Sequence, residues 1–152
     1  MDVTTQAPPK DGLIRSSSSD LNYGIRVVFT SYGPYSSTAG GVSFIGSFTA
    51  NSDTPAFVYN RTVIGASEAG SHETGHTLGL SHDGQGTTTY YGGHGSGETG
   101  WAPIMGASYN RSVSTWDIGQ YTGTNNGSST ANYGKGPDDL AVITGTNGFG
   151  YQ

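Results

Sequence analysis

The segment from His72 to Asp83 constrains the fold more than any other part of the sequence. It places His72 and His76 four residues apart, and on a helix such side chains face the same way, so both imidazoles can reach one metal ion. Gly79 then permits a sharp turn at a backbone angle that most residues would find strained. That turn can return His82 to the first two histidines. The segment therefore predicts a helix that ends near Gly79 and a cluster of three imidazoles.

The chemistry of this cluster is typical of a catalytic zinc site. Three neutral imidazole nitrogens at about 2.0–2.1 Å leave a tetrahedral zinc ion with one open position for water. Glu73, next to the first ligand, can take a proton from that water during attack on a carbonyl and pass it to the leaving amine. A bare His-Glu-x-x-His pair also fits two exposed helix histidines, but the glycine, third histidine and aspartate at fixed offsets make coincidence remote. We therefore predict Glu73 as general base and three zinc ligands, His72, His76 and His82.

A methionine further along the chain extends the pattern into a family resemblance. Met105 is one of two methionines and lies in the sequence Ala-Pro-Ile-Met-Gly. The zinc motif and Met105 together resemble the metzincin zinc peptidases. Asp83, directly after the third histidine, and the Ile104–Met105 pair are similar to the reprolysin (adamalysin) branch, in a cysteine-free version of bacterial type. The resemblance is most specific over residues 72–83 and 103–106.

This resemblance implies an α+β fold, the zincin-like (metzincin) catalytic domain, with a twisted mixed sheet, an active-site helix and a methionine-bearing turn. The cleft would run between the sheet's edge strand and that turn. Met105 would form a floor below the metal, and Asp83 would be a buried structural carboxylate tied to nearby backbone. Taken alone, Met105 also fits an adaptable core residue, and Asp83 fits a plain turn residue. Some branches carry a tyrosine two residues after the methionine. Here Ala107 stands there, and Tyr109 is the supporting residue we consider.

Other residues near the motif have both a functional and a structural interpretation. His94 lies in a glycine-rich loop, where it can assist substrate or the transition state, or simply be exposed. Three aromatic residues either line the cleft or pack the loop against the body, namely Tyr90, Tyr91 and Trp101. The expected strand at 42–48 could accept an extended peptide by strand addition, or be an ordinary surface strand.

Residue patterning predicts three strands and two helices. The strands are expected at 23–29, 42–48 and 55–59. Ser67 is expected to cap the first helix, and Pro137-Asp138-Asp139 to open the second. The glycine- and threonine-rich stretches 84–100 and 120–137 are predicted as loops, since the chain holds 26 glycines and glycine disfavours helices.

Length and composition limit the organisation and the partners of the chain. Its 152 residues fit a single catalytic domain over 1–152, with an irregular lead-in at 1–20. We expect the first elements of the family's domain, and a secretion signal, to lie in a part of the gene not included here. The six Lys and Arg residues and the net charge of -5 argue against a nucleic-acid partner. No apolar run approaches the roughly 20 residues of a membrane span, and the absence of cysteine excludes disulfides and thiol catalysis.

The function predicted from these observations is that of a secreted, monomeric zinc endopeptidase. Metal-activated water would hydrolyse protein or peptide substrates, with zinc as the cofactor. The alternative is a non-catalytic, zinc-stabilised surface or adhesion module that kept the motif. Glu73 separates the two, because a site that had lost catalysis would not need a carboxylate there. Zinc-dependent hydrolysis of a non-peptide amide is a third interpretation.

Overall fold

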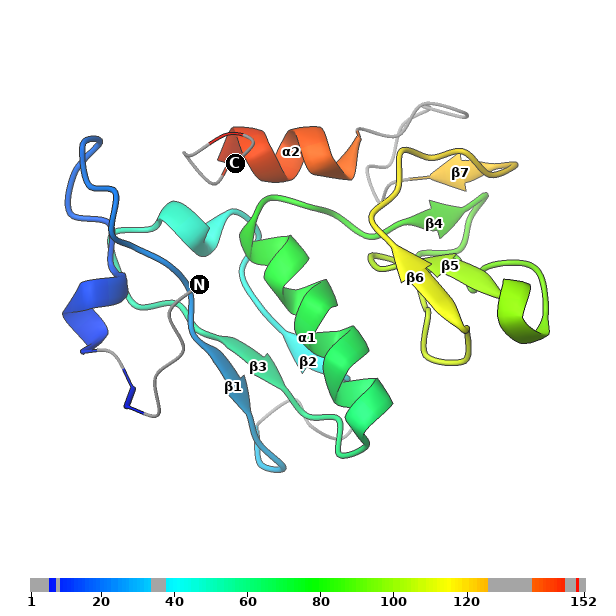
Figure 1. Cartoon of the computed structure of the whole chain (residues 1–152), viewed down its shortest axis with the longest axis horizontal. Helices are drawn as coiled ribbons and strands as arrows, with labels where there is room; N and C mark the ends of the chain where they lie inside the picture. Colours follow the sequence, from blue (N-terminus) through cyan, green and yellow to red (C-terminus); the bar gives the residue numbers. More distant parts are fainter. Residues whose placement is uncertain (1–5, 8, 34–37, 126–137, 147–149, 151–152) are drawn as a thin grey trace.

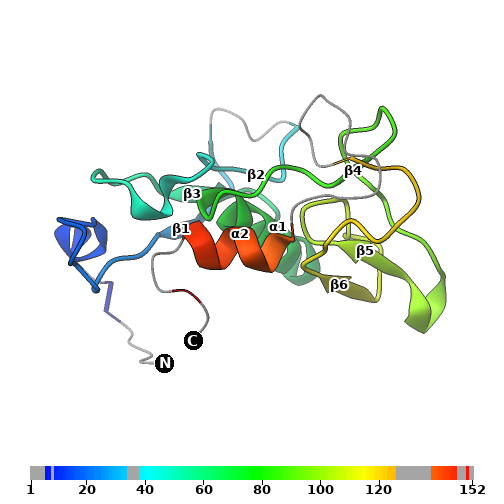
Figure 2. The same cartoon turned by 90° about the horizontal axis from the view of Figure 1, so that it is seen from above.

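The computed structural model describes residues 6–7, 9–33, 38–125, 138–146 and 150. A small three-stranded sheet packs against one long helix, α1 (Val63–Thr77). Figures 1 and 2 both place this sheet on one side of α1 and the later short strands on the other. This mixed α+β arrangement confirms the fold class predicted from the sequence.

The sheet is mixed and has a short edge strand. Its strands, in spatial order, are β1 (Val27–Phe29), β3 (Ala56–Val58) and β2 (Gly41–Val42). β1 pairs with β3 in parallel, and β2 pairs with β3 antiparallel, so that Val42 lies opposite Phe57. Ala56 and Val58 are completely buried, because the central strand faces α1. The predicted strands at 23–29 and 55–59 are therefore present in shortened form.

The helix α1 begins earlier than the sequence predicted. Thr62 has extended backbone, and its hydroxyl accepts a hydrogen bond from the Gly65 N–H at 3.0 Å, as expected of an N-cap. The prediction that Ser67 caps this helix is therefore wrong. Val63 and Ile64 form the first turn of α1. They are 85% and 65% exposed, so the apolar residues at this end of the helix do not belong to its buried face.

The end of α1 follows from a glycine in the left-handed region. Gly79 has a φ of 100°, and its N–H donates to the His76 carbonyl at 2.9 Å. The Leu80 N–H donates to the Gly75 carbonyl at 3.0 Å. These two bonds form a Schellman motif, which stops the helix and turns the chain. The turn predicted at Gly79 is confirmed.

The strand predicted at 42–48 is wrong beyond Val42. The chain leaves the sheet after that residue, and Gly46 adopts a φ of 74° and donates its N–H to the His76 carbonyl. Phe44 and Ile45 are 71% and 61% exposed, so the alternating apolar pattern does not correspond to a buried face. A 3-10 turn follows at Ser47–Thr49.

The region after the zinc motif consists of loops joined by short ladders. The first ladder pairs β4 (Gly84–Gln85) with β7 (Thr124–Asn125), and the second pairs β5 (Trp101–Pro103) with β6 (Val113–Thr115). The 84–100 stretch is largely loop, as predicted, whereas sequence patterning did not indicate the second ladder. Of the predicted loop at 120–137, residues 126–137 lie outside the described residues.

A second helix, α2 (Asp139–Thr146), lies at the end of the molecule towards which α1 runs (Figure 1). The Asp138 carboxylate accepts a hydrogen bond from the Leu140 N–H at 3.0 Å, which caps the helix start. The predicted last helix is therefore confirmed, although Pro137 lies outside the described residues. Within the described part of the chain, neither helix has the length and apolar character needed to cross a membrane.

Candidate metal centre

A pocket of about 550 Å³ lies between the edge strand β2 and the chain around Met105. One wall is the edge segment from Thr38 to Ile45, and the floor is formed by α1. Gly106, Ala107 and Tyr109 supply the opposite wall. The sequence-based expectation for the position of the cleft agrees with these lining residues.

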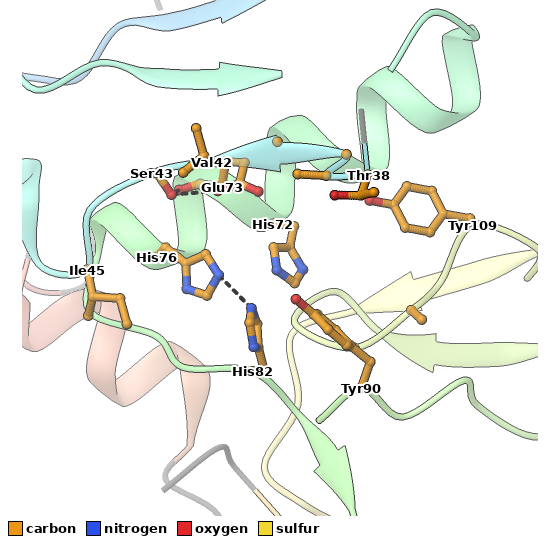
Figure 3. Close-up of a pocket in the computed structure, with 15 residues that line it drawn as sticks. Thr38, Val42, Ser43, Ile45, His72, Glu73, His76, His82, Tyr90 and Tyr109 are labelled. Atoms are coloured by element: carbon orange, nitrogen blue, oxygen red, sulfur yellow. Dashed lines mark hydrogen bonds between the residues drawn. The ribbon is translucent and has the colours of Figure 1, made fainter. Parts of the chain in front are cut away.

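The three histidines of the motif converge in this pocket (Figure 3). One ligand nitrogen from each of His72, His76 and His82 lies within 4.8 Å of the others. The Nε2 atoms of His76 and His82 are 3.0 Å apart. In a tetrahedral site with zinc–nitrogen bonds of about 2.0–2.1 Å, two ligand nitrogens are separated by about 3.3 Å. The donor set fits one zinc ion: the His76–His82 pair is already near tetrahedral spacing, and nitrogens up to 4.8 Å apart would have to approach each other by up to about 1.5 Å.

Hydrogen bonds to the backbone fix the tautomers of two imidazoles. His72 Nδ1 lies 2.9 Å from the Ile104 carbonyl, and His76 Nδ1 lies 2.8 Å from the Leu80 carbonyl. A carbonyl only accepts, so both Nδ1 atoms carry the proton and both Nε2 lone pairs are free for a metal. The Schellman turn after α1 thus brings the Leu80 carbonyl to one of the ligands.

Burial keeps two of the imidazoles, those of His72 and His82, neutral. It lowers the pKa of His72 to about 4, with the neighbouring His76 and His82 acting in the same direction. Burial and then His76 likewise lower the pKa of His82 to about 4. Neutral imidazoles are the form that binds zinc, so these two side chains need lose no proton to bind the metal at neutral pH.

Glu73 lies beside the histidines with its carboxylate against the edge segment. The residue is only 6% exposed, and the Ser43 hydroxyl donates to its Oε2 at 2.6 Å. Burial raises the pKa of Glu73, and the hydrogen bond from Ser43 partly offsets that rise. The sequence did not indicate a role for Ser43, because the two residues are far apart in the chain.

Met105 packs directly beneath the helix. Its side chain is fully buried, and a Cβ at Gly75 would lie 2.5 Å from its Sδ. Only glycine at this position of α1 allows so close an approach. The carbonyl of the preceding Ile104 accepts from His72, so this segment also orients a ligand.

Asp83 is buried at the end of the motif. It is 1% exposed, its N–H donates to the Met105 carbonyl at 2.9 Å, and its carbonyl accepts from the Tyr91 N–H at 2.7 Å. Burial, then Asp139 and Asp117, raise the pKa of the Asp83 carboxyl to about 8. The burial expected of Asp83 is present, but its Oδ2 has no hydrogen-bond partner among the described residues, and the two hydrogen bonds given above are made by its main chain.

Two tyrosines line the pocket from different segments. The Tyr90 ring lies 4.3 Å from the His82 ring and 6.1 Å from the His72 ring, measured between centroids. Tyr109 lies further along the same wall (Figure 3), and a Cβ at Gly40 would be 2.8 Å from its hydroxyl. Burial, followed by Glu73, raises the pKa of both phenols, so both hydroxyls stay protonated and can donate.

The other residues considered from the sequence lie away from the histidine cluster. His94 Nδ1 lies 2.9 Å from the Tyr91 hydroxyl, and the His94 ring contacts Trp101 at 5.2 Å between centroids. His94 and Trp101 line a separate pocket. Tyr91 is buried and stacks on Tyr121 at 4.0 Å, so it packs the loop against the body.

Comparison with known proteins agrees with this geometry. No curated protein and no solved structure gives a match to the chain. Residues 6–83, which include the sheet, α1 and all three histidines, match the family described as metallo-peptidase family M12B, reprolysin-like. This match covers just over half of the chain. The protein therefore belongs to the M12B reprolysin-like family of zinc metallopeptidases.

Proposed function

We propose that the protein is an endopeptidase in which His72, His76 and His82 hold zinc and Glu73 is the general base. Family membership makes it a zinc peptidase that acts on proteins or peptides. The observation that carries the finer assignment is the buried Glu73 carboxylate in the same pocket as the three imidazoles.

The residues of the pocket suit hydrolysis without a covalent intermediate. When bound, zinc supplies Lewis acidity, which polarises a peptide carbonyl and makes a water molecule more acidic. Glu73 accepts the proton of the attacking water and delivers it to the leaving amine. Its burial favours this role, because a raised pKa strengthens the carboxylate as a base.

The lining of the pocket favours cleavage inside a peptide chain. An enzyme that removes terminal residues needs a charged group to bind a free carboxylate or amine. Among the described residues that line the pocket there is no Lys or Arg, and Glu73 is the one carboxylate. The edge strand β2 lies along the wall, where an extended peptide can add as a further strand.

The decisive test is the variant Glu73→Ala. We expect it to bind one zinc per chain and to lose about 10²–10⁴-fold in kcat on a peptide blocked at both termini, the usual contribution of a general base. Glu98→Ala is a matched control, because Glu98 is an exposed carboxylate outside the pocket. Wild-type activity in Glu73→Ala would refute the assigned base.

The same experiment addresses the non-catalytic alternative. A zinc-stabilised adhesion module would bind the metal but cleave no blocked peptide, in wild type or in any variant. Extracellular location and a monomeric state remain predictions, which cell fractionation and sedimentation would check.

A further inference from the structure

A hydrogen bond joins the edge of the sheet to the carboxylate of Glu73. Ser43 follows directly after β2, and its hydroxyl lies 2.6 Å from Glu73 Oε2 and 2.9 Å from the Glu73 carbonyl. A hydroxyl has a single proton, so the two acceptors compete for it. The shorter contact, to the charged acceptor, is the stronger one.

Gly41 supplies the space for this arrangement. A Cβ at Gly41 would lie 2.6 Å from Glu73 Cγ and 2.7 Å from Glu73 Oε1, closer than packed atoms allow. Gly41 and Ser43 therefore both lie on the side of the edge segment that faces Glu73. The missing side chain at 41 admits the carboxylate, and the hydroxyl at 43 holds one of its oxygens.

We propose that Ser43 is a positioning residue, which fixes the Glu73 carboxylate in one orientation beside the three histidines. The inference rests on the proposed function of Glu73 as base. The physical basis of this proposal is that a catalytic group that is present but misplaced lowers the reaction rate. Because Ser43 belongs to the edge segment, the base is fixed to the wall that would bind the peptide as well as to the helix that carries the ligands.

The first test separates chemistry from binding. Kinetics on a blocked peptide are compared for zinc-loaded wild type, Ser43→Ala and Ser43→Thr. We expect Ser43→Ala to lower kcat by about 10–100-fold, the usual effect of losing a partner that orients a site residue, with KM and zinc content unchanged. Ser43→Thr keeps the hydroxyl and should retain most of kcat. Ser71→Ala is the control, since Ser71 is exposed on α1 next to His72.

The second test uses zinc-free protein and needs no activity. Thermal unfolding midpoints are measured for Ser43→Ala, Glu73→Ala and the double variant. Two residues that interact give non-additive effects, so Ser43→Ala should lower the midpoint more in wild type than in the Glu73→Ala background, where the hydroxyl can still donate to the main-chain carbonyl of residue 73. Equal losses in both backgrounds would overturn the proposed hydrogen bond.

The outcomes distinguish this inference from the proposed function. An active wild type with unchanged kcat in Ser43→Ala overturns the positioning role alone. A zinc-loaded wild type that cleaves no peptide overturns the endopeptidase assignment, and the positioning role with it.

Discussion

The two sides of the metal pocket are built by different means. The regular wall, residues 27–33 and 38–77, is held by a sheet and a capped helix. The irregular wall, residues 84–125, has ladders of two or three residues. There the Arg111 guanidinium donates to main-chain carbonyls of the glycine-rich loop, those of Gly92, Gly93 and Gly95.

The two walls contribute different parts of the metal site. The regular wall sets the spacing of His72 and His76, which lie on one helix. The irregular wall adds groups that local spacing cannot supply, such as the Ile104 carbonyl and the Tyr90 ring. His82 lies at the boundary between the two walls, so a metal ion bound by all three histidines would cross-link them.

Removal of the metal should have the largest effect and should fall on one wall. Zinc at about 100 times its Kd adds about 2.7 kcal/mol to stability, so chelation should lower the unfolding midpoint by about 5–10 °C. Hydrogen exchange should then show greater loss of protection in residues 84–125 than in β1 and β3. Equal loss in both walls would contradict the proposed cross-link, and added zinc should restore both measurements.

Two glycines of α1 allow the contact between the walls to be tested within one helix. A Cβ at Gly75 would meet Met105 Sδ at 2.5 Å and Trp116 Cζ3 at 3.1 Å, so Gly75→Ala should destabilise by about 1–3 kcal/mol in urea unfolding. A Cβ at Gly70 meets only the Phe29 ring edge at 3.3 Å, and Phe29 is 60% exposed and free to move. Gly70→Ala should therefore stabilise, by up to about 1 kcal/mol. Similar effects of both variants would show that the walls are not closely packed at Met105.

The buried carboxyl of Asp139, at the start of α2, accepts a hydrogen bond from the Asp117 N–H of the irregular wall at 2.9 Å, and its ionisation should make stability depend on pH. Burial raises the pKa of Asp139 to about 6, with Asp117 and Asp138 adding to the rise. An acid with a raised pKa holds its proton in the folded state, so its contribution to stability is lost as the pH rises from about 4 through 6. The rise in pKa corresponds to at most about 3 kcal/mol, and solvent screening reduces it, so Asp139→Asn should gain about 1–2 kcal/mol over wild type at pH 8 and almost nothing at pH 4. Urea unfolding at the two pH values measures this difference, and an equal gain at both would exclude the ionisation as its cause.

The smallest expected effect concerns the hydrogen bonds from Arg111 to the glycine-rich loop, which we call the loop clamp. Arg111→Lys keeps the charge, but one ammonium group cannot span the separate carbonyls that the guanidinium reaches. We expect a loss of about 0.5–1 kcal/mol, the value of a typical hydrogen bond, and faster proteolysis between residues 92 and 100. Arg61→Lys, at an exposed position of the regular wall, is the control. Unchanged proteolysis in Arg111→Lys would show that the loop does not depend on the clamp.

The parts of the site that the sequence predicted are those encoded by local spacing. His72 and His76 are one helical turn apart, and Gly79 requires a turn whatever surrounds it. The strand predicted at 42–48 extends too far, because Phe44 and Ile45 continue an alternating pattern although the chain turns away at Gly46. Apolar alternation cannot reveal which residues leave a sheet.

The missed contributions come from residues distant in sequence. Ser43 meets Glu73 only because the sheet folds onto α1. A usable signal was present in the pair Gly40–Gly41, since glycine within a strand often marks a close approach by another group. Tyr90 was considered from the sequence as a residue that lines the cleft, and it lines the pocket; its contact with His82 could not be predicted, because the loop that brings it there is fixed by contacts along the irregular wall.

The Nδ1 protons of His72 and His76 point to main-chain oxygens, those of Ile104 and Leu80. Every amino acid supplies such an oxygen, so a substitution at 80 or 104 that leaves the chain path intact keeps the ring orientation. Transplanting this centre into another scaffold would therefore require two copied backbone traces in addition to the side chains of the histidines and the glutamate. A graft of side chains alone would leave two rings free to rotate.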